Sequence, residues 1–69
     1  MTRARDINRV RLRREEMGIL LKELADEIGR SAALVSMIEG GFVPKRMTQV
    51  SIAAALKTTP ESLWPKEYA

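Results

Sequence analysis

The sequence contains no cysteine and no histidine. Without cysteine there are no disulfide bonds, no thiolate nucleophile and no cysteine-ligated zinc, and without histidine there is no imidazole base or imidazole metal ligand. The remaining acid–base groups are carboxylates on helix faces that the pattern predicts to be solvated. We therefore expect no catalysis, no metal and no cofactor.

Aromatic residues are also scarce, because the chain has one phenylalanine, one tryptophan and one tyrosine. Aliphatic side chains must therefore form the core of a single domain, since 69 residues expose too little apolar surface for two cores. No apolar run approaches the roughly 20 residues of a membrane span, and the first ten residues, MTRARDINRV, lack the apolar segment of a signal peptide. We expect a cytoplasmic domain with no membrane partner.

The formal net charge is only +3, yet the charges lie in bands along the chain. Residues 3–14 hold six of the twelve basic residues and a single acidic one, Asp6. Residues 15–27 hold five acidic residues against Lys22, and positive charge returns at Arg30, Lys45 and Arg46. Two interpretations stay open, because such bands form the solvated faces of amphipathic helices or a surface that faces phosphates.

Apolar residues at helical spacing predict five short helices, and no alternating strand pattern is present. The first helix has Asp6 as its N-cap and ends at Gly18. Its apolar face consists of Ile7, Val10 and Met17, with Arg14 on the same face. The second helix covers residues 20–28 and ends at Gly29, which tolerates the positive φ that a turn requires.

Three further helices are expected after that turn. Ser31 is a natural N-cap for a third helix over residues 32–39, which the glycine pair at 40–41 ends. Residues 42–46 predict a loop because of Pro44. A fourth helix runs from about Met47 to Leu56 or Lys57, with the apolar residues Val50, Ile52, Ala53 and Leu56. A fifth begins at Pro60, behind Thr59 as cap, and runs through Trp64.

The second and third helices have the spacing of a helix-turn-helix. That motif needs a small residue where the helices cross, a turn residue able to take positive φ, and apolar residues that dock the second helix. Ala25 is the small residue and Gly29 the turn residue. The inward positions are Leu24, Ile28, Val35 and Ile38.

On these residues the chain resembles the Cro/C1 (XRE) family of phage and bacterial helix-turn-helix regulators. The resemblance runs from about Ile7 to Trp64 and rests on RREEMG, ELADEIGRSAALVSMIEGG, Pro44, IAAAL and TPESLW. It implies an all-α, five-helix, lambda-repressor-like domain over residues 1–69, with a flexible basic arm at 1–5 and a tail at 65–69. It further implies nucleoid localisation, operator DNA as partner and a homodimer. The resemblance also implies a charged pair between Arg14 and Glu39. The alternative for this pair is that both charges merely reach solvent.

The resemblance also implies which residues face the DNA. The base-facing positions of the third helix are Ala32, Ala33, Ser36 and Met37. The positions beside the DNA backbone are Leu21, Lys22, Arg30, Ser31, Lys45 and Arg46. Reading guanine or adenine with paired hydrogen bonds requires Arg, Lys, Asn or Gln, which the third helix lacks. The third helix can still recognise a sequence through apolar contact with thymine methyl groups and through one hydrogen bond from Ser36. DNA shape is a further source of specificity.

Both ends of the chain contain further candidates. Arg3, Arg5 and Arg9 form an arm along the DNA backbone or in a minor groove, or else a solvated terminus. Leu63, Trp64 and Tyr68 are candidates for a dimer interface. For Trp64 a role as a lid on the core is the alternative, because so small a domain needs its only tryptophan for burial.

A second reading of the helix-turn-helix segment stays open. Leu20, Leu21, Ala33, Leu34 and Met37 together make an exposed apolar surface that fits a protein partner, unless Leu20 and Leu21 fold partly into the core with Ile19. The expected function is a sequence-specific regulator, a repressor of phage, mobile-element or bacterial origin that acts by occupying its operator. The alternative is a protein-interaction module or an antitoxin-like autoregulator.

Overall fold

The computed structural model describes residues 8–65, which form an all-helical domain. In that part of the chain there are five helices and no strand: α2 (Val10–Glu16), α3 (Leu21–Ile28), α4 (Ala32–Glu39), α5 (Arg46–Ala55) and α6 (Pro60–Leu63). The all-α expectation is therefore confirmed. No helix within the described range is long and apolar enough to cross a membrane.

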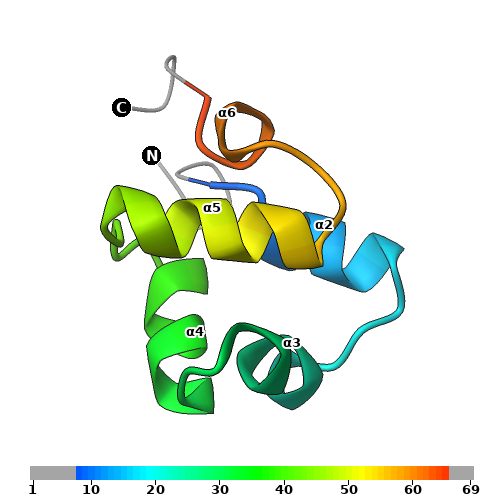
Figure 1. Cartoon of the computed structure of the whole chain (residues 1–69). Helices are drawn as coiled ribbons and strands as arrows, with labels where there is room; N and C mark the ends of the chain where they lie inside the picture. The colour runs from blue at the N-terminus through cyan, green and yellow to red at the C-terminus, as the bar shows by residue number, and fades with distance from the viewer. Residues whose placement is uncertain (1–7, 66–69) are drawn as a thin grey trace.

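The helices pack around α5, which crosses the middle of the molecule (Figure 1). α6 lies on one side of α5, and α3 and α4 lie on the other. In this view α3 is seen almost along its axis whereas α4 lies across the view, so the two axes meet at a large angle. α4 also contacts α2, and it is therefore held from two sides.

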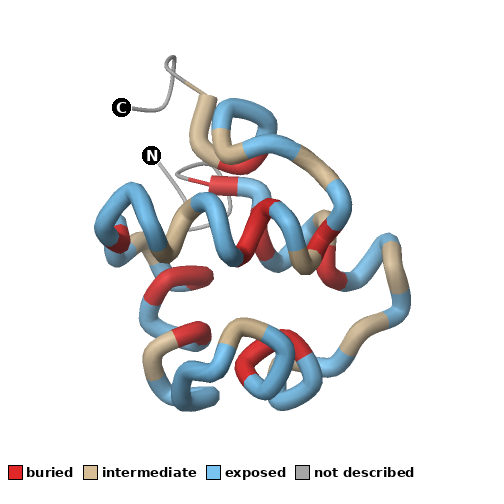
Figure 2. The backbone as a smooth tube through the Cα atoms, in the orientation of Figure 1, coloured by how far each residue is buried: buried red, intermediate tan, exposed pale blue. Residues whose placement is uncertain are grey.

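The core is aliphatic, as the scarcity of aromatic residues predicts. Nine side chains with at most 1% of their surface exposed form it: Val10, Leu24, Ala25, Val35, Ile38, Ile52, Ala53, Leu56 and Leu63. Half-buried Trp64 packs against this cluster, as expected of a lid. The buried segments line the inner sides of the helices, while the outer sides are exposed (Figure 2).

Three helix starts differ from the predictions. α3 begins at Leu21, one residue later than expected, with Leu20 as its N-cap. α2 begins at Val10 rather than at Ile7. Its N-cap is Arg9, and the Asn8 side chain just before it accepts a hydrogen bond from the Val10 N–H at 3.0 Å. The predicted cap, Asp6, lies outside the described residues, as does Ile7. α5 begins at Arg46, one residue earlier than expected, because the chain after Pro44 is already free to turn into a helix.

In the C-terminal half of the fold, two further details differ from the predictions. Val50, expected on the inner face of α5, is exposed, and α6 ends at Leu63, with Trp64 as its C-cap. Thr59 caps α6 as predicted, because its hydroxyl oxygen accepts a hydrogen bond from the Ser62 N–H at 3.2 Å. The order and number of the predicted helices are otherwise those of the described chain.

Candidate nucleic-acid interface

The turn between α3 and α4 is built from Gly29, Arg30 and Ser31. Gly29 adopts φ 70° and ψ 31°, the left-handed conformation that ends α3 and costs other residues conformational energy. The Ser31 hydroxyl then accepts a hydrogen bond from the Leu34 N–H at 3.1 Å and so starts α4. The change of direction is therefore encoded in two capping positions, Gly29 and Ser31, with one residue between them.

α4 has a buried inner side and an exposed outer side. Val35 and Ile38 are fully buried and dock the helix in the core. The four residues expected to face bases, Ala32, Ala33, Ser36 and Met37, are all exposed and lie at the spacing of one helical face. The structure therefore brings these four residues together, and we refer to them as the outer face of α4.

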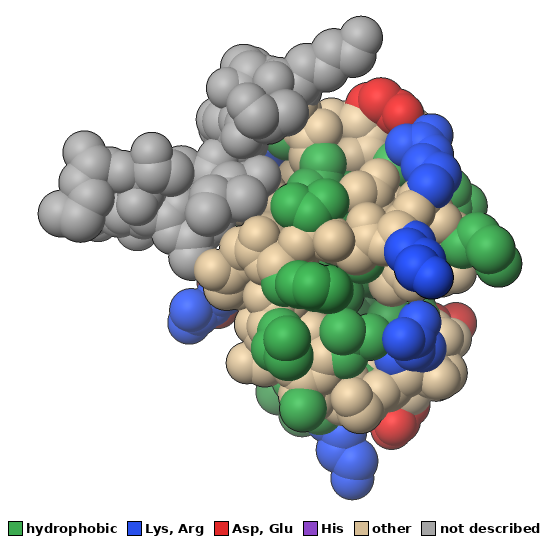
Figure 3. Space-filling view, turned by 90° about the vertical axis from the view of Figure 1, so that its left-hand side faces the viewer, with side chains coloured by type: hydrophobic (Ala, Val, Ile, Leu, Met, Phe, Trp, Pro, Cys, Tyr) green, Lys and Arg blue, Asp and Glu red, His purple; other side chains and the backbone are tan. Residues whose placement is uncertain are grey.

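Exposed basic residues lie just before α4 and at the start of α5. Exposed Arg30 donates a hydrogen bond to the Thr48 hydroxyl at 3.3 Å, and exposed Lys45 is the N-cap of α5. Arg46 forms a salt bridge with Glu61 at 3.0 Å in which both side chains are about two-thirds exposed. A space-filling view of this end of the molecule shows hydrophobic side chains in the middle and a column of basic side chains along one edge (Figure 3).

The residues expected to form an exposed apolar surface around the start of α3 differ in their exposure. Leu20 is the N-cap and is exposed, while its N–H donates to the Glu23 carboxylate at 2.8 Å. Leu21, and likewise Leu34 of α4, is half-buried and packs against the core together with Ile19. The alternative that Leu21 folds partly into the core with Ile19 is therefore confirmed, whereas Leu20 stays exposed, and the predicted surface is wrong for Leu34 because core packing covers part of it. Lys22 of the expected backbone set is exposed.

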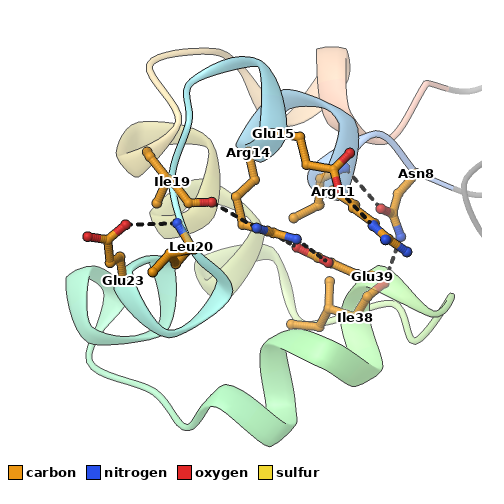
Figure 4. Close-up of polar contacts among 10 residues, drawn as sticks. Asn8, Arg11, Arg14, Glu15, Ile19, Leu20, Glu23, Ile38 and Glu39 are labelled. Atoms are coloured by element: carbon orange, nitrogen blue, oxygen red, sulfur yellow. Dashed lines mark hydrogen bonds and ion pairs between the residues drawn. The ribbon is translucent and has the colours of Figure 1, made fainter.

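A salt bridge anchors the C-terminal end of α4 to α2. Arg14 Nε donates to Glu39 Oε2 at 2.7 Å and Arg14 Nη2 donates to Glu39 Oε1 at 3.3 Å, with side-chain exposures of 11% and 7% (Figure 4). Arg14 Nη1 also donates to the Ile19 carbonyl at 2.8 Å. The hydrogen bonds to Glu39 raise the pKa of Arg14 and outweigh the lowering effect of burial. The two charges face each other and not solvent.

Asn8 is a second anchor of the same helix end, and sequence reasoning missed it. Its Nδ2 donates to the Ile38 carbonyl at 2.7 Å while its Oδ1 accepts from the Val10 N–H, and the residue is 2% exposed (Figure 4). One side chain thus joins the start of α2 to the end of α4. The available signal was an Asn two residues before the apolar Val10, because Asn side chains commonly bond the backbone two residues further on.

No protein-family model, curated protein or solved structure gives a significant match to the chain. Two of the expected positions differ in the structure. Arg9 belongs to the folded domain and not to an arm, because its N–H donates to the Leu63 carbonyl at 2.8 Å. Leu63 itself lies in the core and presents no surface to a second copy. Arg3, Arg5 and Tyr68 lie outside the described residues.

Exposed apolar side chains extend beyond α4, which the sequence analysis did not anticipate. Met37 is 56% exposed, and the loop after α4 and the first turns of α5 add Phe42, Val43 at 60%, Met47 at 83% and Val50. The Phe42 N–H donates to the Met37 carbonyl at 3.0 Å, so the loop starts directly beside α4. The signal for this surface was the pair Phe42–Val43 after two glycines, where a loop residue is normally polar.

Proposed function

We propose that this chain is a sequence-specific, double-stranded DNA-binding transcriptional regulator that represses by occupying its site. The observation on which this rests is the outer face of α4, four exposed residues at one helical spacing, together with exposed basic residues on the neighbouring segments. Exposed Arg30 lies just before α4, and exposed Lys45 and Arg46 lie at the start of α5, which Arg30 contacts through Thr48. An exposed helix of this width fits the major groove, and cations beside it neutralise phosphates. The source we infer is a phage, a mobile element or a bacterial chromosome.

We infer further that α3 and α4 form a helix-turn-helix in a lambda-repressor-like domain. Support comes from the buried small residue Ala25, the left-handed Gly29, the Ser31 cap, and the docking of α4 through Val35 and Ile38. Arg14 and Asn8 add rigidity because they hold the far end of α4. A reading helix needs such support, since a small displacement misaligns its contacts with bases.

Phosphate contacts are the part of binding that the basic residues support best. Lys22, Arg30, Lys45 and Arg46 are exposed, and Ser31 starts α4 where its first N–H groups point outwards. Arg46 exchanges its exposed contact with Glu61 for a phosphate at little cost, because salt bridges between exposed groups contribute little. Binding is therefore strongly dependent on salt.

The regulator acts as a homodimer that spans two major grooves about 34 Å apart. Since Leu63 is buried, the surface we infer for the second copy is the exposed apolar group on the loop and α5, which we call the α5 patch. It consists of Phe42, Val43, Met47 and Val50. Apolar groups exposed this far on a small domain favour association.

A protein-interaction module is the second candidate. The observation that favours it is the continuation of exposed apolar residues from Met37 to the α5 patch. An antitoxin-like autoregulator would use this surface for a partner protein and the exposed basic residues for DNA. In that case a stable complex with a protein encoded beside this chain is expected.

The test is a gel-shift titration with duplex DNA from the gene's own promoter, with a shuffled duplex of equal length as control. We expect both to bind at low salt and only the promoter fragment to remain bound as salt rises, because phosphate contacts are shared and base contacts are not. If neither duplex shifts at low salt while a protein encoded alongside forms a stoichiometric complex, the interaction module replaces the regulator as the function.

A further inference from the structure

The chemistry of the outer face of α4 restricts what that face is able to recognise. Ala32 and Ala33 end in methyl groups and Met37 in a thioether, so only Ser36 offers a conventional donor or acceptor. Paired hydrogen bonds to guanine or adenine require Arg, Lys, Asn or Gln, and α4 contains none of these. The face therefore has few means of reading purine edges.

One apolar group does occur on base edges in the major groove, and it is the C5-methyl group of thymine. Cytosine methylated at C5 presents the same methyl at the same ring position. We infer that the outer face of α4 recognises pyrimidine C5-methyl groups, so that the ligand is duplex DNA whose site is defined by thymine or 5-methylcytosine. This inference rests on the proposed function and specifies the chemistry of its binding site.

The charges around the face favour DNA over an apolar protein as its occupant. Arg30 directly precedes the N-cap of α4 and donates to Thr48 of α5, and Lys45 and Arg46 at the start of α5 are exposed as well. In Figure 3 a column of basic side chains follows one edge of the hydrophobic area. A polyanion that offers methyl groups between two phosphate strands matches both features. A partner protein would need an apolar centre within an acidic rim to match them equally well.

The experiment begins with a binding site selected from a random duplex library. That site is synthesised with thymines replaced singly by deoxyuridine, which removes only the methyl group. Each contacted thymine is expected to lose about fourfold in affinity, the effect of one buried methyl group. Where cytosine replaces a contacted thymine, 5-methylcytosine is expected to bind about fourfold more tightly than cytosine.

Two variants assign the effect to α4. Met37→Ala shortens an exposed side chain and should remove the preference for thymine over deoxyuridine at one position or more. Leu12→Ala is the matched control, because it shortens another exposed apolar side chain, on α2, away from the outer face of α4 and from the α5 patch. It should leave every such preference unchanged. Thermal melting of both variants verifies that the fold is intact.

Other results overturn the inference and distinguish it from the proposed function. If the thymine and deoxyuridine sites bind equally while shuffled DNA binds weakly, methyl recognition is wrong and sequence-specific binding stands. If no duplex binds at any salt concentration, both proposals fail. If Met37→Ala abolishes a complex with a co-expressed protein and leaves DNA affinity unchanged, the face of α4 is a protein surface and the inference is again wrong.

Discussion

Arg14 and Glu39 meet in a salt bridge of two hydrogen bonds, with Nε–Oε2 at 2.7 Å and Nη2–Oε1 at 3.3 Å, at the junction of α2 and α4. Both residues are 9% exposed, so neither charge is well hydrated. A third hydrogen bond of the guanidinium, to the Ile19 carbonyl, fixes the segment that leads into α3. Arg14 thus connects α2, the end of α4 and the segment that leads into α3.

Replacing Glu39 with alanine should lower the free energy of unfolding by roughly 3 to 5 kcal/mol, because a buried guanidinium loses its counter-charge. Urea unfolding followed by circular dichroism measures this loss. Glu15→Ala is the control, since it breaks the exposed Arg11–Glu15 pair and should cost less than about 1 kcal/mol. Equal losses in the two variants would contradict the burial of the Arg14–Glu39 pair.

The same salt bridge also predicts how stability depends on pH. The hydrogen bonds to Glu39 raise the pKa of Arg14 above its unfolded value. The stability that results is fully present below the unfolded-state pKa and is lost only as pH rises through the folded-state pKa. Since the unfolded-state pKa of arginine already lies far above the neutral range, Arg14 contributes no loss of stability between neutral pH and about pH 10.

Asn8→Ala should destabilise the domain by about 1 to 3 kcal/mol, because the Ile38 carbonyl and the Val10 N–H lose a buried partner. Asn8→Asp separates the two roles. It retains an acceptor for Val10 but buries a carboxylate against a carbonyl oxygen, and it should cost more than alanine does. Thermal melting of the variants tests this order, and an aspartate variant as stable as the wild type would refute it.

Gly29→Ala should cost about 1 to 2 kcal/mol because alanine is strained at φ 70°. No atom beyond the adjacent residues lies within 4 Å of an added methyl group, so the cost is conformational and not steric. Gly40→Ala is the matched control, since Gly40 has φ −84° and an added methyl group would meet only ordinary contacts at 3.5 Å. Chemical denaturation of both variants should show a loss only at position 29.

Much of the scaffold was predictable from the sequence because helical periodicity alone selects the inward positions. Leu24, Ala25, Val35 and Ile38 are all buried, as their spacing requires. Ser31 caps its helix for a similarly local reason, since its side chain and the N–H that it binds are three residues apart. Such features need no knowledge of distant parts of the chain.

The missed features depend on contacts between residues far apart in the sequence. Asn8 and Asp6 are both residues whose side chains bond nearby backbone N–H groups, and what favours Asn8 is the Ile38 carbonyl, 30 residues away. Leu63 is in the core because α6 packs against α5. A helix of four residues is too short for a periodic pattern of apolar residues to identify its buried side. Leu21 is half-buried whereas Leu20 is exposed, and this difference likewise depends on how the neighbouring helices pack.

Met47→Lys should shift a homodimer toward monomer, because it introduces a charge into the most exposed hydrophobic side chain of the α5 patch. Sedimentation velocity at several protein concentrations measures the shift. Leu12→Lys is the control, since Leu12 is also an exposed hydrophobic residue but lies on α2. A wild type that stays monomeric at high concentration, or a dimer indifferent to Met47→Lys, would exclude the α5 patch as the interface.

Lys45→Gln should weaken binding to every duplex by a similar factor, because we assign Lys45 to phosphate contact and not to base reading. The slope of log K against log salt should fall by about one unit as one ion pair is lost. Lys57→Gln is the control, because it removes the same charge from an exposed lysine that lies beyond the opposite end of α5. A loss confined to the selected site, or an equal change of slope for Lys57→Gln, would show that Lys45 has no phosphate contact of its own.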